Sequence, residues 1–149
     1  MSSKINWCLE QKKGIKLVEL KPHLSESYIK ESDESLNVCF KLEGKWKLIS
    51  GYYACYNAFY SLSMKAGIKC EIHDCSIELM ELFGFQDDDI NFLRKLKSDR
   101  IQTQYYLKDI LLRDESKVIE FVSKCKEMLE ELNSEKIENI RNKMKEIIK

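Results

Sequence analysis

The stretch at residues 45–66 constrains the fold more than any other part of the chain. Between residues 52 and 60 only Asn57 is strongly polar, and five of the side chains are aromatic, namely Tyr52, Tyr53, Tyr56, Phe59 and Tyr60. Gly44 and Gly67 bound the stretch on either side. A helix that is apolar nearly all round must be buried nearly all round. We therefore expect it to be either the central helix of a bundle or a helix shared with a partner chain.

The composition favours helices throughout a single domain. The chain has 149 residues, which is the size of one ordinary domain, and 44% of them are hydrophobic. It contains one proline and five glycines, so few residues interrupt helices. Lys plus Arg equals Asp plus Glu at 25 each, so the molecule as a whole is not an electrostatic binder of nucleic acid.

The cysteines and the lengths of the apolar runs indicate the cellular compartment in which the protein is expected. Six cysteines are scattered along the chain without a CxxC pair, and we expect them to be small buried side chains in a reducing cytoplasm. No zinc-site spacing is present, so neither a metal nor another cofactor is expected. No apolar run reaches the roughly 18 residues of a membrane span, and the first residues do not resemble a signal peptide. The sequence therefore predicts a soluble, cytoplasmic protein without a membrane partner.

Hydrophobic periodicity divides the chain into seven helical segments. They are expected at residues 4–13, 24–42, 45–66, 73–84, 87–112, 114–132 and 134–148. The pattern predicts an all-α fold, an up-down four- or five-helix bundle with extra short N-terminal and C-terminal helices. Residues 1–149 are expected to form one domain, with a core at about 5–132 and a C-terminal helix at about 134–148.

Arg100 stands at an unusual place in the segment 87–112. On a helical projection Arg100 and Gln104 fall in the middle of the apolar arc rather than opposite to it. A buried guanidinium keeps its charge and has five donors to satisfy. One interpretation is that Arg100 pairs with an acid or extends past the helix into solvent. The other is a cleft or dimer interface where Arg100 binds phosphate or a partner's acid, with Tyr105 and Tyr106 one turn away.

His73 and a run of basic residues are the other candidate functional features. His73 stands where a helix begins, and it is either a structural residue with one satisfied ring nitrogen or a general acid or base. The basic run comprises Arg94, Lys95, Lys97 and Arg100. It is either a solvated helix face or the place where an RNA backbone is held.

Two segments together resemble the HEPN family (higher eukaryotes and prokaryotes nucleotide-binding). Residues 51–80, GYYACYNAFYSLSMKAGIKCEIHDCSIELM, resemble its aromatic helix, the glycine after that helix and the histidine at the start of the next one. Residues 100–106, RIQTQYY, resemble its R-x-x-A-D-Y signature. Arg100 and Tyr105 match that signature, whereas Thr103 and Gln104 replace its Ala and Asp. Residues 5–36 also resemble the N-terminal helix, connector and second helix of the small stand-alone branch of this family, so the likeness covers roughly residues 5–130.

The resemblance implies a helical bundle that dimerises and pairs with a minimal nucleotidyltransferase acting as its antitoxin. Many members are metal-independent endoribonucleases that use an R-x4-6-H motif duplicated across a dimer. In this chain Tyr105, Tyr106 and Leu107 stand where that histidine is expected, counting from Arg100.

Three interpretations of function stay open. The first is a HEPN toxin-like protein of a toxin–antitoxin pair that cuts RNA, with Arg100 on the scissile phosphate and Tyr105 or His73 assisting proton transfer. The second is a non-catalytic dimeric HEPN module that binds a nucleotide or its nucleotidyltransferase partner. The third is a scaffold whose C-terminal helix packs on another protein. In the dimeric interpretations, part of the aromatic surface of residues 45–66 faces a second copy. The candidate binding residues are Gln104, Lys97, Tyr106 and Tyr53.

Overall fold

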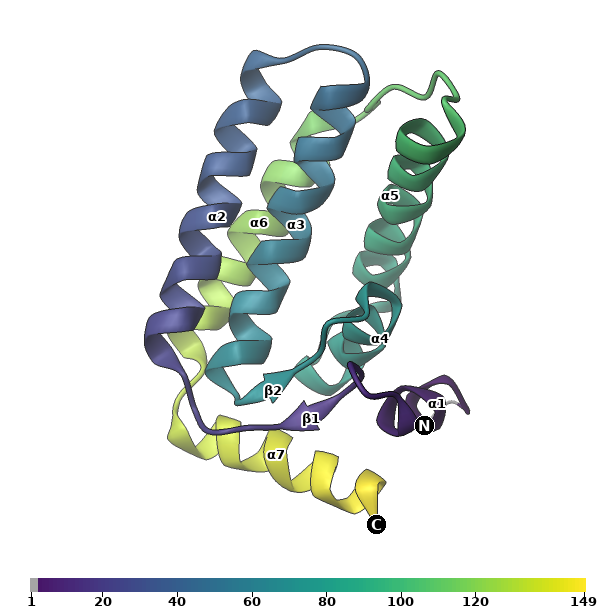
Figure 1. The fold of residues 1–149 in the computed structure, drawn as a ribbon. Coiled ribbons are helices and arrows are strands. Elements are labelled where there is room, and N and C mark those ends of the chain that lie inside the picture. Colours follow the sequence, from purple (N-terminus) through teal and green to yellow (C-terminus); the bar gives the residue numbers. More distant parts are fainter. Residues whose placement is uncertain (1–2) are drawn as a thin grey trace.

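The computed structural model describes residues 3–149 and confirms an all-α helical bundle (Figure 1). Seven α-helices, one 3-10 helix and two short strands make up this part of the chain. In order they are α1 (Ser3–Glu10), β1 (Lys16–Leu17), α2 (Pro22–Lys41), α3 (Lys45–Lys65), β2 (Ile68–Lys69), α4 (His73–Glu78), η1 (Leu79–Phe83), α5 (Asp87–Tyr106), α6 (Glu115–Glu131) and α7 (Ser134–Ile148). Across residues 3–149, no helix is both long and apolar enough to span a membrane.

The four long helices α2, α3, α5 and α6 run up and down in turn, as predicted (Figure 1). The short helices α1, α4 and α7 gather near one end of the bundle, beside a two-stranded ribbon. In that ribbon β1 and β2 pair antiparallel, with Lys16 opposite Lys69 and Leu17 opposite Ile68. The sequence did not indicate these strands, because two residues are too few to show an alternating pattern.

Helix α3 is the buried centre of the bundle. Tyr52, Ala54, Cys55, Ala58 and Phe59 have no exposed surface, and α2, α5 and α6 pack around the helix. The predicted burial of this helix on all sides is therefore confirmed, and the helices that cover it belong to the same chain. Of the five aromatic side chains only that of Tyr53 is partly exposed. The apolar surface of α3 therefore no longer argues for an interface with a second copy. The homodimer stays a prediction.

Two buried serines of α2 bond to the backbone of α3, beside the apolar contacts of Tyr28 and Leu36 with the core. The Ser25 hydroxyl donates to the carbonyl of Ser61 and the Ser32 hydroxyl to that of Ala54, each over 2.7 Å. Both serines are buried. The apolar periodicity of residues 24–42 predicts that Leu24, Tyr28, Leu36, Cys39 and Leu42 face inward. Cys39 is buried and Tyr28 and Leu36 pack against the core, whereas Leu24 and Leu42 are each 39% exposed. Small side chains let the two backbones approach closely, and each hydroxyl meets an acceptor on the facing helix.

Several helix ends differ from the predicted segments. Helix α1 ends at Glu10 rather than at residue 13, and α4 ends at Glu78, where the 3-10 helix η1 follows. Helix α5 ends at Tyr106 rather than near Leu112, because Leu107 adopts a left-handed conformation with φ 55° and residues 107–114 form a connection. The Asp114 carboxylate accepts a hydrogen bond from the Lys117 backbone N–H and begins α6 as expected. At α7 the capping side chain belongs to Asn133, which accepts from the Lys136 backbone N–H.

The prediction that every cysteine is a free thiol was wrong for two of the six. Cys8 of α1 and Cys75 of α4 form a disulfide across 67 residues of sequence. The remaining four cysteines are free and buried, as expected. Sequence spacing gave no signal for this pair, because only the fold brings α1 beside α4.

The C-terminal helix α7 packs on its own chain. Ile137, Ile140 and Met144 are buried there. One guanidinium nitrogen of Arg141 donates to the backbone carbonyls of Val18, Ala66 and Gly67, each at 3.0 Å. These contacts fasten α7 to the ribbon and to the end of α3. The narrow apolar face of α7 is thus used within the chain, which weakens the scaffold interpretation.

Ser32→Leu should destabilise the protein by about 1–3 kcal/mol, because the larger side chain overpacks the α2–α3 contact and leaves the Ala54 carbonyl without its donor. Urea unfolding followed by circular dichroism measures the change. Ser27→Leu is the matched control, since Ser27 is exposed on the same helix and should change stability by less than about 0.5 kcal/mol. Equal effects of the two substitutions would contradict the close packing described here.

Candidate functional site

Helices α4 and α5 each bring a polar side chain to the neighbouring rings of Tyr52 and Tyr53 in α3. His73, the first residue of α4, shares a 2.7 Å hydrogen bond between its Nδ1 and the Tyr52 hydroxyl. From α5, the guanidinium carbon of Arg100 lies 4.9 Å from the centre of the Tyr52 ring and 5.5 Å from that of Tyr53. The fold therefore brings the two strongest sequence candidates, His73 and Arg100, to the same pair of tyrosines.

Arg100 is buried without an acid partner. Only 6% of its surface is exposed, and none of the ion pairs between residues 3 and 149 includes it. Its Nη1 donates to the Tyr53 hydroxyl and to the Gln104 side-chain carbonyl, both over a long 3.3 Å. Neither structural explanation considered from the sequence, a paired acid or a side chain extended into solvent, describes this arginine. The faces of Tyr52, Tyr53 and Tyr105 supply cation–π attraction instead.

Two polar atoms on α5 have no hydrogen-bond partner. They are Nε of Arg100 and the hydroxyl oxygen of Thr103, and they are the only such buried side-chain atoms found between residues 3 and 149. Residues three apart in a helix lie on the same face. An unpaired buried polar group costs about 1–3 kcal/mol, and more when it is charged. The α5 face at Arg100 thus carries uncompensated hydrogen-bonding capacity and a positive charge.

The environment of His73 keeps its imidazole neutral. The ring stacks on Tyr56 with centroids 3.9 Å apart and planes 11° apart. Burial lowers the pKa of His73 to about 4, and the charges of Arg100 and Lys97 act in the same direction, while Asp74 opposes them. Burial also raises the pKa of Tyr52 far above its ordinary value, so its phenol stays protonated. Either the Tyr52 hydroxyl donates to Nδ1, leaving the proton of the ring on Nε2, or Nδ1–H donates to the phenol oxygen.

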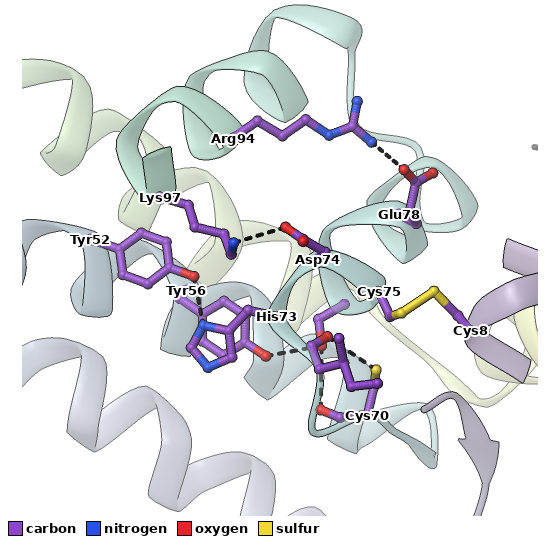
Figure 2. A network of polar contacts seen from close by, with 12 residues as sticks. Cys8, Tyr52, Tyr56, Cys70, His73, Asp74, Cys75, Glu78, Arg94 and Lys97 are labelled. Atoms are coloured by element: carbon purple, nitrogen blue, oxygen red, sulfur yellow. Dashed lines mark hydrogen bonds and ion pairs between the residues drawn. A yellow bond between two sulfur atoms is a disulfide. The ribbon is translucent and has the colours of Figure 1, made fainter. Parts of the chain in front are cut away.

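The first turns of α4 are held in place by contacts that surround His73 (Figure 2). The Tyr56 hydroxyl donates to that of Ser76 over 2.9 Å. Asp74 pairs with Lys97 of α5 at 2.9 Å. Burial raises the pKa of Asp74, but the Lys97 ammonium outweighs it and holds that pKa below its ordinary value. These contacts fix the position of His73 relative to α3 and α5.

The basic run on α5 is largely neutralised. Arg94 pairs with Glu78 at 2.7 Å, Lys95 with Asp99 at 3.3 Å, and Lys97 with Asp74 at 2.9 Å. Of the four basic side chains only Arg100 lacks an acid. The run therefore does not present the continuous positive face that would track an RNA backbone.

The other predicted site residues divide into two groups. Tyr53 and Gln104 are bonded to Arg100, and the Tyr105 ring lies 5.9 Å from its guanidinium carbon at the exposed edge. Tyr106 is 66% exposed, and no hydrogen bond or ring contact found within residues 3–149 joins it to Arg100. Sequence reasoning did not select Tyr52, Tyr56 or Asp74. The four-residue spacing of Tyr52 and Tyr56 was visible but indicated only a buried face.

A groove between two of the long helices lies away from these residues. It has a volume of about 980 Å³ and lies between α5 and α6, where Phe92, Leu96 and Phe121 contribute to its lining. Arg100 and His73 do not line it. Tyr53 and Gln104 are half-buried, so a ligand reaches Arg100 only where these side chains or Tyr105 shift. The Arg100 cluster, and not the groove, combines a buried unpaired cation with an imidazole.

Among residues 3–149 no group of three or more His, Cys, Asp or Glu side chains is arranged to hold a metal ion. Comparison of the chain with protein-family models, with curated proteins and with solved structures finds no match. Any functional assignment thus depends on the geometry at Arg100 and on the motifs in the sequence.

The imidazole of His73 should titrate near pH 4, well below the ordinary 6.5, as followed by its NMR resonances. Between pH 4 and pH 6.5 the unfolded chain therefore binds more protons than the folded chain does. The contribution of His73 to stability is therefore complete above pH 6.5 and is lost as the pH falls towards 4. His73→Gln identifies the resonances and should flatten this part of the stability profile. A titration near 6.5 would contradict the buried, stacked position.

Proposed function

We propose that this chain binds a phosphate group, carried by a nucleotide or by an RNA end, at Arg100. The observation that supports the proposal is a guanidinium with 6% exposure, no acid partner and an unpaired Nε. Phosphate oxygens accept two parallel hydrogen bonds from a guanidinium, which makes this side chain well suited to them. An entering phosphate would neutralise the buried charge and satisfy the free donor.

The surroundings favour a small phosphate ligand over a long nucleic acid. The other basic side chains of α5 are paired with acids, so the attraction is concentrated at one point. The exposed ring of Tyr105 beside Arg100 offers a face on which a base can stack. We therefore favour the non-catalytic nucleotide-binding module among the interpretations of the sequence. Membership of the HEPN family, the homodimer and the nucleotidyltransferase antitoxin stay predictions from the resemblance.

Arg100→Gln should weaken binding of a nucleoside monophosphate at least about tenfold, since a charge-assisted hydrogen bond contributes about 1.5–3 kcal/mol. Isothermal titration calorimetry at low salt measures the affinity. Arg100→Lys keeps the charge but lacks the planar fork, and it should restore only part of the binding. Arg113→Gln is the matched control, because Arg113 is exposed on the connection after α5. Equal affinity of wild type and Arg100→Gln would refute the site.

A second function, metal-independent RNA cleavage, is favoured by one observation. His73 is hydrogen-bonded to Tyr52, whose ring also contacts Arg100, so an imidazole does stand near the arginine although R-x4-6-H is absent. In such a reaction the neutral His73 would accept the proton of a ribose 2′-hydroxyl. The 2′-oxygen would then attack the adjacent phosphorus, and the bond from phosphorus to the 5′-oxygen would break. The departing 5′-oxygen would take a proton from the protonated His73 or from water, while Arg100 neutralises the charge on the phosphate.

Cleavage is tested by incubating several RNAs with the purified chain in EDTA. If the second function is correct, wild type cuts RNA and both Arg100→Gln and His73→Gln lose about 10²-fold or more in rate. Arg113→Gln should cut as wild type does. Absence of cleavage by wild type, together with nucleotide binding that requires Arg100, would leave the binding module as the function.

A further inference from the structure

A covalent tie connects the N-terminal helix to the helix that carries His73. The disulfide joins Cys8 of α1 to Cys75 of α4, two residues beyond His73 (Figure 2). Both cysteines have no exposed surface, and α1 packs against α4. The disulfide therefore lies on one side of α4, whereas the contacts of His73 and Ser76 with α3 lie on the other.

Helix α4 depends on such contacts for its position. It has six residues, and a helix of that length is not stable by itself in water. Its non-covalent ties to the bundle include the His73–Tyr52 and Ser76–Tyr56 hydrogen bonds and the ion pairs Asp74–Lys97 and Glu78–Arg94. The side chain of Ile77 is also buried. Only the disulfide is covalent, and it fixes α4 from the outer side.

Helix α1 is short and has few buried residues. It has eight residues at the N-terminal end of the described chain, and its buried residues are Ile5 and Cys8. Trp7, between them, is 45% exposed. Short segments with few buried contacts open locally at low cost. Such opening would admit a reductant to a disulfide that is otherwise buried.

We propose that the Cys8–Cys75 pair is a redox-sensitive tether that sets how firmly α4 and His73 are held against α3. A dithiol reductant gives two electrons and two protons, the Sγ–Sγ bond breaks, Cys8 and Cys75 become thiols, and the reductant becomes a disulfide. In the reduced state α1 is released and α4 loses its outer support. The proposal concerns the position of His73 and holds whether or not phosphate binds at Arg100.

The first experiment counts thiols. Alkylation of the air-purified, denatured chain should modify four cysteines without reductant and all six after dithiothreitol, because four are free in the fold. Six modified cysteines before reduction would overturn the proposal.

The second experiment compares amide hydrogen exchange of wild type with and without dithiothreitol. Reduction should speed exchange roughly tenfold or more in α1 and in α4, and leave the buried amides of α3 unchanged. Modification of His73 by diethyl pyrocarbonate should become faster in parallel. Unchanged exchange in α4 would overturn the proposal, even if phosphate binding at Arg100 proved correct.

Variants of single cysteines separate the tether from other effects of the reductant. Cys8→Ser should show fast exchange in α1 and α4 from the start and no response to dithiothreitol. Cys39→Ser is the matched control, because Cys39 is free and buried in α2, and it should respond as wild type does. An equal response of Cys8→Ser and wild type would overturn the proposal. If a variant does not fold, the comparison of oxidised and reduced wild type still decides the matter.

Discussion

The burial of α3 on all sides is the constraint on which the rest of the structure depends. A helix with aromatic side chains around its circumference must be covered on every side, and α2, α5 and α6 each cover part of it. The aromatic rings also define the candidate site, because Tyr52 and Tyr53 receive His73 from one direction and Arg100 from another. Core and site therefore share residues, so the side chains that stabilise the bundle also position the polar groups.

Much of the fold was accessible from the sequence because it follows from periodicity. The long helices, the buried centre and the start of α6 near residue 114 follow from spacing within a few turns, which one sequence displays directly. The ribbon, the disulfide and the inward serines of α2 were missed. Each depends on which segments meet in space, and a serine that bonds a facing carbonyl looks like a surface serine in sequence.

The candidate site was predictable only in part. Arg100 and Gln104 were found because their place on the apolar arc conflicts with their chemistry, and such a conflict is visible in sequence. That His73 lies at the same tyrosines was not predictable, because it depends on how the chain between α3 and α5 folds back. Tyr106 looked equivalent to Tyr105, but adjacent residues on a helix point about 100° apart, and only Tyr105 lies near the guanidinium.

Three contacts close loops of the chain at the end of the bundle that holds the ribbon, and each loop lies within the next larger one. The Ser25–Ser61 contact spans 36 residues, the β1–β2 pairing encloses it, and the Cys8–Cys75 link spans 67. Once the α2–α3 hairpin forms, the two strands are already neighbours, and their pairing in turn brings α1 towards α4. Each step then closes only a short additional length of free chain, so the loop entropy is lost in small increments. A topology whose contacts span long distances in sequence can thus assemble by local steps that begin at one hairpin.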